Sequence, residues 1–246
     1  PGVPLAEQAE IGHNRWHPDL PFLTSVKPGE EILIESLDFL DAQIKDTDDI
    51  SDVKNVDLTR AHPLTGPFYV EGAEPGDLLV IDLLDIQPIS DVGFSGVFAK
   101  ENGGGFLADY FPEADKAIWD LKGLFATSRH IPGVRIAGLK HPGLMGTLPS
   151  HDLLKEWNRR EALLVPKGQA NPPDPRTAVL RGVTGAEFDR MAAEAARTVP
   201  PREHGGNTDI KDLAAGSRIY FPVYQKGAGF SMGDLHFSQG DGEIGF

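Results

Sequence analysis

The hydrophobic positions of this chain fall into short runs that are separated by turns rich in glycine and proline. Runs of this kind, bounded by turn residues, are typical of buried β-strands. Pro28-Gly29 and Pro75-Gly76 each precede one of the runs, and both pairs predict type II turns in which the glycine adopts a positive φ. The predicted strands are residues 32–40, 66–70, 78–86, 134–139 and 218–224.

Helical periodicity is confined to one part of the chain. Ser150 can cap a helix that extends to about Val165, because the apolar residues of this segment would then share one stripe. The alanine-rich residues 185–197 show the same spacing. We therefore expect a single β-rich body formed by residues 1–246, with a small helical insertion at about 150–198.

The composition is that of an ordinary globular protein, with 40% hydrophobic and 24% charged residues. Its 28 glycines and 20 prolines favour many turns and short strands. The formal net charge of -14 repels phosphate groups and anionic lipids, so we expect no nucleic-acid partner and no membrane partner. No apolar run approaches the roughly 20 residues that span a bilayer, and the first residues do not resemble a secretory signal. The expected location is therefore the cytoplasm.

Residues 233–243 carry a dense group of candidate ligands and proton carriers. Because the sequence has no cysteine, a metal site here must use imidazole and oxygen ligands. On an extended strand Asp234 and His236 project from the same face, and a following turn can bring Asp241 and Glu243 near them. This pattern predicts a metal-assisted hydrolytic site. The alternative is a surface hairpin in which Asp241 is only a turn residue.

A second polar group is found at residues 204–209, where His204, Asn207 and Asp209 surround two adjacent glycines. Glycine allows the backbone to approach a ligand closely. If this loop and the terminal group belong to adjacent strands, their polar side chains meet at one site. The alternative is a tight loop in which Asp209 only caps a turn.

The segment 128–133 supplies a third polar group. Arg129 can orient an amide or a carboxylate, and His130 can carry a proton. An exposed loop that holds both residues for solubility is the alternative. We interpret His141, which precedes a proline, as structural, and the polar and aromatic residues at 13–19 as packing or interface residues.

The chain resembles the formamidase/acetamidase family, and in particular its formamidase branch, at residues 128–133, 204–213 and 233–243. Further similarity, in the same order and at similar spacing, covers residues 13–18, 65–77, 102–106 and 198–204. The resemblance implies a mainly β, sandwich-like fold that usually forms homo-oligomers. It also implies hydrolysis of the C–N bond of short aliphatic amides, such as formamide to formate and ammonia. Related members open γ-lactam rings.

Chains of this family continue well past the position of Glu243. We therefore expect this sequence to be part of a longer protein. Its C-terminal remainder, in the same chain or in a separate one, would supply groups that are not seen here.

An amidase must polarise the carbonyl oxygen, generate a nucleophile and protonate the leaving nitrogen. A divalent ion, zinc rather than calcium, provides the first two functions if His236, Asp209 and Asp234 hold it. Glu243 would then carry the proton. The remaining candidates are Asn207 and Arg129 for oxyanion stabilisation, His130 as a further catalytic residue, and His204 and Asp241 as further metal ligands.

Two alternatives stay open. The acidic and amide side chains can instead hold a structural calcium ion in a β-sandwich module without catalytic activity. A side-chain nucleophile in the C-terminal remainder is also compatible with the pattern, in which case the residues named above only orient the substrate.

Overall fold

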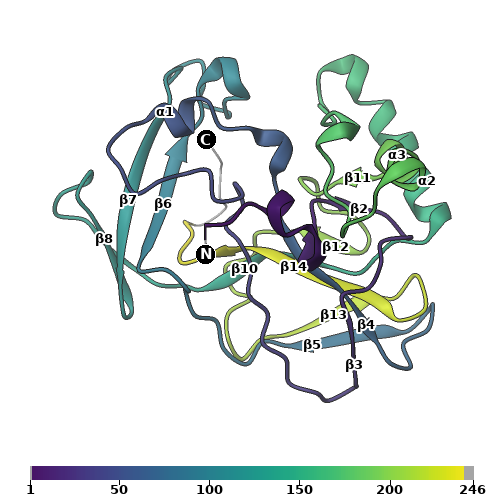
Figure 1. Cartoon of the computed structure of the whole chain (residues 1–246). Coiled ribbons are helices and arrows are strands. Elements are labelled where there is room, and N and C mark those ends of the chain that lie inside the picture. The colour runs from purple at the N-terminus through teal and green to yellow at the C-terminus, as the bar shows by residue number, and fades with distance from the viewer. Residues whose placement is uncertain (1, 241–246) are drawn as a thin grey trace.

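The computed structural model describes residues 2–240 and consists mainly of short strands (Figure 1). Within these residues the largest sheet has six strands, in the order β1-β4-β14-β10-β12, with β3 paired to β4. Only the β3–β4 pairing in this sheet is parallel among the pairs described. The strands are β1 (Gly12–His13), β3 (Thr24–Val26), β4 (Leu64–Val70), β10 (His141–Gly146), β12 (Gly205–Asn207) and β14 (Ala228–His236).

A second sheet of four antiparallel strands, β6-β7-β8-β9, lies on the opposite side of the view in Figure 1 from the two longer helices. Two further antiparallel ribbons are formed by β5 with β13 and by β2 with β11. The prediction of a mainly β fold is therefore confirmed. The strands are β2 (Arg15–Trp16), β5 (Leu78–Asp82), β6 (Val92–Val97), β7 (Asp115–Lys122), β8 (Phe125–Ser128), β9 (Arg135–Ala137), β11 (Ala196–Arg197) and β13 (Arg218–Pro222).

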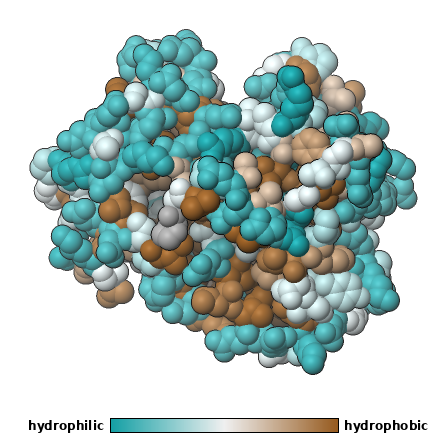
Figure 2. All heavy atoms as spheres, in the orientation of Figure 1, coloured by the Kyte–Doolittle hydropathy of each residue, from teal (hydrophilic) through white to brown (hydrophobic). Residues whose placement is uncertain are grey.

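The β5–β13 ribbon packs against the large sheet and gives the fold its sandwich-like layering. Side chains alternate along β5, so that Leu79 and Ile81 face inward while their neighbours are exposed. Phe221 of the ribbon shares a buried cluster with Phe68 and Phe230 of the large sheet. Figure 2 shows apolar surface over the lower part of the same view, where β5 and β13 lie in Figure 1.

The helices form where the sequence predicts them. Ser150 caps α2 (His151–Ala162) by accepting a hydrogen bond from the Leu153 N–H at 3.2 Å, and α3 (Gly185–Glu194) follows. Both helices lie within residues 150–198 and bury Trp157 and Met191 in one cluster with Trp16 of β2. The short helices are α1 (Ser51–Lys54), η1 (Leu5–Ile11), η2 (Leu58–Arg60), η3 (Lys100–Asn102), η4 (Val165–Lys167) and η5 (Pro175–Thr177). No helix among residues 2–240 is both long and apolar enough to cross a bilayer.

Four of the five predicted strands are confirmed: β5, β9 and β13 with shorter bounds, and β4 with a start two residues earlier than predicted. The predicted type II turns are consistent with positive φ at Gly29 (81°) and Gly76 (97°). The predicted strand at 32–40 is wrong.

Residues 32–40 have no strand assignment, although their hydrophobicity is high. Leu33 is 90% exposed, and the Asp38 carboxylate accepts hydrogen bonds from the N–H groups of Leu40 and Ala42, both at 2.9 Å. These bonds close a turn and bury Leu40 in a local cluster. The segment is apolar enough for a strand, but it forms no ladder with a neighbouring strand.

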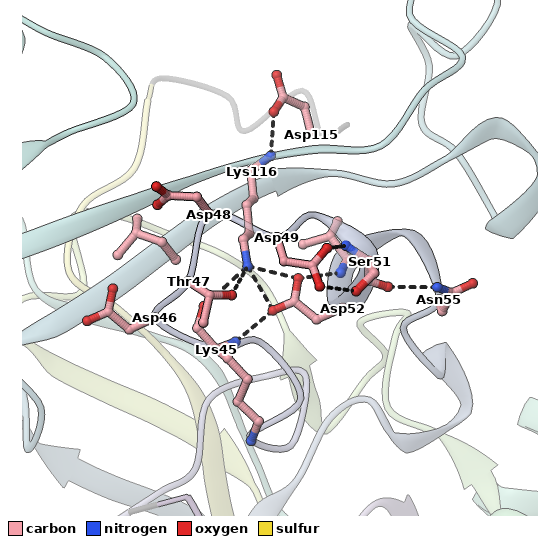
Figure 3. Close-up of polar contacts among 12 residues, drawn as sticks. Lys45, Asp46, Thr47, Asp48, Asp49, Ser51, Asp52, Asn55, Asp115 and Lys116 are labelled. Carbon is pink, nitrogen blue, oxygen red and sulfur yellow. Dashed lines mark hydrogen bonds and ion pairs between the residues drawn. The ribbon is translucent and has the colours of Figure 1, made fainter.

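The four-stranded sheet contains a buried ion pair between Lys116 of β7 and Asp52 of α1 (Figure 3). The Lys116 ammonium is 2.8 and 2.9 Å from the two Asp52 carboxylate oxygens and donates to the Lys45 carbonyl at 3.2 Å. Burial by itself would raise the pKa of Asp52, but hydrogen bonds from Lys116 and from the N–H groups of Lys45 and Val53 outweigh burial and lower it. The pair fastens residues 46–52, an acidic segment that runs into α1 and that we call the acidic loop, to the sheet.

We expect Lys116→Met to destabilise the protein by about 3 kcal/mol, because it leaves the Asp52 carboxylate without its cation. The melting temperature should fall by roughly 6–12 °C. Since the Asp52 pKa is lowered in the folded protein, the stability from this pair is present above the ordinary carboxyl pKa near 4 and is lost as the pH falls through the folded value. Thermal unfolding at pH 7 and pH 3 measures both effects.

Lys122→Met is the matched control, because Lys122 is on the same strand but is 80% exposed and lies 4.0 Å from Asp120. It should leave the melting temperature unchanged at both pH values. An equal loss in both variants would contradict the assignment of stability to the buried pair.

Candidate metal centre

Strand β10 lies between β14 and β12. Polar side chains from β14 and from the loop after β12 converge over Gly143 of β10. Asp234 and His236 come from the end of β14, and Asp209 follows β12 by two residues. The carbonyl of Gly143 accepts hydrogen bonds from the N–H groups of Thr208 at 3.0 Å and Asp209 at 3.1 Å. These two bonds hold the loop after β12 against β10 and therefore position the Asp209 side chain.

Three donor atoms lie close to one another in this group. His236 Nε2 is 3.4 Å from Asp234 Oδ1 and 3.5 Å from Asp209 Oδ1. One ligand atom from each residue lies within 4.8 Å of the other two, and Asp234 is only 6% exposed. A single imidazole with two carboxylates at this spacing could hold a metal ion.

Gly143 leaves the space into which the three donor atoms point. A Cβ atom added at this residue would lie 2.5 Å from Asp209 Oδ1, from Asp234 Oδ2 and from His236 Nε2. A carbon atom cannot occupy that position, because non-bonded carbon contacts are optimal at about 3.5–4.0 Å. The donors therefore surround a small volume beside the β10 backbone that only glycine leaves open.

Both carboxylates leave the backbone at residues with positive φ, 46° at Asp209 and 53° at Asp234. This region is uncommon for residues other than glycine, and aspartate is among those that tolerate it best. At Asp234 it interrupts the extended geometry of β14, so the side chain does not follow simple strand alternation. Such strained positions cluster at functional sites.

In this group, neighbouring side chains offset the effect of burial on the pKa values. Burial alone would raise the pKa of Asp234, but the side chains of His236 and His62 and a contact with Asp209 outweigh it, so that the pKa is lowered. Burial lowers the pKa of His62, and the nearby carboxylates Asp234 and Asp209 oppose this shift. At neutral pH the centre therefore combines an ionised Asp234 carboxylate with a neutral imidazole at His62.

His141 extends the group across the β10–β14 pairing, where it is the register partner of His236. The two imidazole rings lie 4.8 Å apart between centroids, at 30°. His141 Nδ1 donates to the Leu139 carbonyl, and burial lowers the pKa of the ring. In the neutral ring the lone pair is then on Nε2, which is buried and has no hydrogen-bond partner among residues 2–240. An imidazole held in this way is typical of metal-ligating histidines.

Comparison with known proteins identifies the family of the chain. The model of the Acetamidase/Formamidase family matches residues 2–246. The chain belongs to the acetamidase/formamidase family. It is 57% identical to a formamidase of Methylophilus methylotrophus over 99% of its length, and 52% identical to an acetamidase of Mycolicibacterium smegmatis over 98%. A solved structure described as a gamma lactamase from Delftia acidovorans is 56% identical and superposes over 96% of this chain with a TM-score of 0.92.

This family member spans about three fifths of the length of the proteins that it matches. The aligned part is 61% of the formamidase, 63% of the acetamidase and 60% of the gamma lactamase chain. The remaining parts of those proteins have no counterpart in this sequence.

His204, a predicted ligand, is not part of the donor group. Its ring packs between Trp16, at 4.6 Å, and Trp157, at 4.5 Å, and a Cβ at Gly146 would approach it to 2.9 Å. Burial, together with the nearby Arg202 charge, lowers the pKa of His204 to about 3. Trp16 of β2 and Trp157 of α2 hold this histidine beside Gly146, three residues further along β10 than Gly143.

The contacts of Arg129 and His130 are with the acidic loop and β7 rather than with the donor group. Arg129 binds Asp48 and Asp46, each at 2.8 Å, and His130 Nε2 lies 3.1 Å from Asp48. His130 Nδ1 in turn accepts a hydrogen bond from the Ile118 N–H at 3.0 Å. Both side chains thus connect the acidic loop to the four-stranded sheet, because the carboxylates of that loop are their nearest counter-charges.

Asn207 lies next to the donor group, on β12, but its amide nitrogen donates to the Val199 carbonyl at 3.0 Å. Its Oδ1 is buried without a hydrogen-bond partner among residues 2–240. Asp241 and Glu243 lie outside the described residues.

Sequence reasoning missed three members of the centre. It interpreted His141 as structural, and it assigned no role to His62 or to Gly143. The His-Pro-Gly sequence at 141–143 was the available signal, because a glycine inside a strand often marks a site where a ligand or another backbone approaches closely. For His62 the sequence contains no comparable signal.

Proposed function

We propose that this protein is a metal-assisted hydrolase that cleaves the C–N bond of short aliphatic amides, with formamide as the first substrate to test. The observation that carries the proposal is the convergence of Asp209, Asp234 and His236 on the open space beside Gly143. Further support comes from the relative named formamidase at 57% identity. Because the chain spans only part of that relative, the activity of the whole protein is part of the proposal.

The donor set favours zinc over calcium. Zinc accepts imidazole and carboxylate ligands in a four-coordinate arrangement, whereas calcium takes six to eight oxygen atoms. His236 Nε2 and the lone pair of His141 Nε2 are nitrogen donors that calcium does not prefer. When bound, such an ion polarises the substrate carbonyl and lowers the pKa of water.

The chain's own residues have the following proposed roles. Asp209, Asp234 and His236 hold the ion, and His141, oriented through Leu139, is a fourth candidate donor. Burial of Asp234 and His62 keeps the centre in surroundings where charges interact strongly. Glu243 remains our proposed proton carrier, and Asn207 remains our proposed contact for the substrate oxygen.

A γ-lactam is the second candidate substrate. The specific support is the solved structure described as a gamma lactamase, at 56% identity and a TM-score of 0.92. A lactam carries the same amide carbonyl and nitrogen, so the same polarisation and proton transfer would open the ring. We also propose that a C-terminal remainder, which the relatives possess, completes the site, and that the protein forms homo-oligomers.

Purified protein should release ammonia from formamide and acetamide or open a γ-lactam ring, and prolonged treatment with a chelator should abolish this activity. Zinc should restore it, because the donor set contains nitrogen, and calcium should not. Ammonia release, amine formation from the lactam and metal content measure the result. The assay is run with this chain alone and with the C-terminal part of the Methylophilus methylotrophus formamidase supplied as a second chain.

Absence of product from all three substrates under both conditions would contradict the hydrolase. Binding of calcium but not of zinc, with complete oxygen coordination and no activity, would favour the structural calcium module instead.

A further inference from the structure

The helical region contains a hollow of about 240 Å³ that shares no lining residue with the metal centre. Its walls come from α2, α3, the proline-rich residues 172–175, and the paired strands β2 and β11. Two arginines line it, Arg15 of β2 and Arg197 of β11. Figure 1 shows this region on the opposite side of the large sheet from β7 and β8.

Arg15 is a buried cation with neutral partners. It is 2% exposed, and its guanidinium donates to the carbonyls of Asn14 at 2.7 Å and Thr59 at 2.9 Å and to the Thr177 hydroxyl at 2.9 Å. No carboxylate among residues 2–240 forms an ion pair with it, and the more distant Asp57 charge only partly offsets the effect of burial, which lowers its pKa to about 10. Arg15 is therefore still charged at neutral pH. A buried charge whose direct partners are all neutral is costly, which makes this side chain receptive to an anion.

The second arginine lies directly across from the first. Arg15 and Arg197 are register partners in the antiparallel β2–β11 pairing, and like charges in opposed positions repel. Arg197 is ion-paired with Glu161, which also lines the hollow and lies 3.6 Å from Arg202. Arg197 and Arg202 therefore share the charge of one carboxylate, and Arg15 adds a third guanidinium group nearby. This local positive charge is unusual in a chain with a formal net charge of -14.

The rest of the hollow is largely apolar. Pro172, Pro173 and Pro175 form one wall, and Ala192 and Ala193 of α3 contribute to another. Proline and alanine have little side-chain freedom to lose, so the space is largely preformed. A charged group beside a short apolar wall fits a ligand with one anionic end and a small hydrocarbon end.

We propose that this hollow binds a short-chain carboxylate such as propionate, with the carboxylate at Arg15 and Arg197 and the hydrocarbon end against the prolines. Among residues 2–240, Arg197 uses only its Nε, toward Glu161, so its Nη1 and Nη2 groups can donate two parallel hydrogen bonds to a carboxylate. Arg15 contributes its charge from the opposite strand. Inorganic phosphate has no apolar part and fits this site less well. A carboxylate is also the product class of the proposed amide hydrolysis, but the inference rests on the arginine pair and not on that activity.

Saturation-transfer NMR of propionate with chelator-treated protein tests the proposal without substrate turnover. The unmodified protein should transfer saturation to the propionate methyl and methylene protons. Ala193→Phe should reduce this transfer at least about fivefold, because the ring fills the hollow without removing a charge. Arg197→Gln should reduce it similarly while Glu161 keeps Arg202 as a partner.

Ala186→Phe is the matched control. Ala186 is exposed on the same helix, seven residues and about two turns before Ala193, and it does not line the hollow. Propionate binding should be unchanged in this variant. Unchanged transfer in both Ala193→Phe and Arg197→Gln, or equal competition by inorganic phosphate, would overturn the proposal. Loss of the signal in His236→Ala but not in Ala193→Phe would assign the propionate to the metal centre and would overturn it as well.

This experiment is independent of the proposed hydrolase activity. If no amide is hydrolysed but propionate binding depends on Ala193 and Arg197, the carboxylate site stands and the proposed function fails. If amides are hydrolysed but propionate binding is insensitive to both positions, the opposite holds.

Discussion

Gly143→Ala is expected to abolish both metal binding and amide hydrolysis. The added Cβ would lie 2.5 Å from donor atoms of Asp209, Asp234 and His236, in the volume that these atoms surround. Its φ lies outside the left-handed region, so the substitution acts through this contact and not through backbone strain. Loss of the several kcal/mol that a Lewis-acid centre contributes corresponds to a decrease in kcat/KM of at least about 1,000-fold.

Gly93→Ala is the matched control for this experiment. Gly93 also lies in a strand, β6, and a Cβ there would come no closer than 3.6 Å to the flexible Leu121 side chain. The control should keep its metal content, its activity and its melting temperature. Metal analysis and ammonia release are measured on both variants. A Gly143→Ala protein that is folded and retains full metal content would show that the donors do not use this space.

His236→Ala is expected to lower metal affinity at least about 100-fold and to lower activity with it. The substitution removes one of the three convergent donors and also the partner that lies 3.4 Å from the buried Asp234 carboxylate. The Asp234 carboxylate then loses the imidazole that lowers its pKa, which disfavours its ionised form. Metal affinity is measured by competition with a chromogenic chelator, and activity by ammonia release.

The control for the histidine is His151→Ala. His151 is 56% exposed at the start of α2 and pairs with Asp19 at 3.0 Å, outside the donor group. Its replacement should change neither metal affinity nor activity. Full activity together with full metal content in His236→Ala would contradict the assignment of His236 as a ligand.

Much of the fold can be predicted from local sequence. The helix cap at Ser150 and the glycines of the two Pro-Gly turns act through neighbouring residues, and the structure contains each of them where predicted. Residues 32–40 show the limit of this reasoning. Their hydrophobicity is that of a strand, but a strand also requires a partner with free backbone groups, and no such ladder forms there.

The candidate centre likewise combines features that local sequence predicts with features that depend on strand order. Asp234 and His236 are two residues apart, so their proximity is largely a local property of β14. Asp209 joins them because β10 lies between β12 and β14, an order that no local pattern specifies. The same order explains Gly143, whose missing side chain matters only because three donors from other segments face it.

For Arg129 and His130 the fold provides partners outside the donor group. Their chemistry suits an active site, but the closest carboxylates in space are Asp46 and Asp48, and electrostatic attraction directs both side chains to that loop. His204 similarly has the chemistry of a ligand but is enclosed by two tryptophans. Residue type alone does not decide which partner a side chain meets.

The sequence by itself determined the β-rich class, the helical segment, the turns and the family, because periodicity, caps and long motifs are carried by residues close together in the chain. The tertiary structure decided which polar residues share a centre, the glycine that leaves space for an ion, and the pairing of Arg15 with Arg197 beside a hollow. These features depend on strand order and register, which arise from contacts between distant segments.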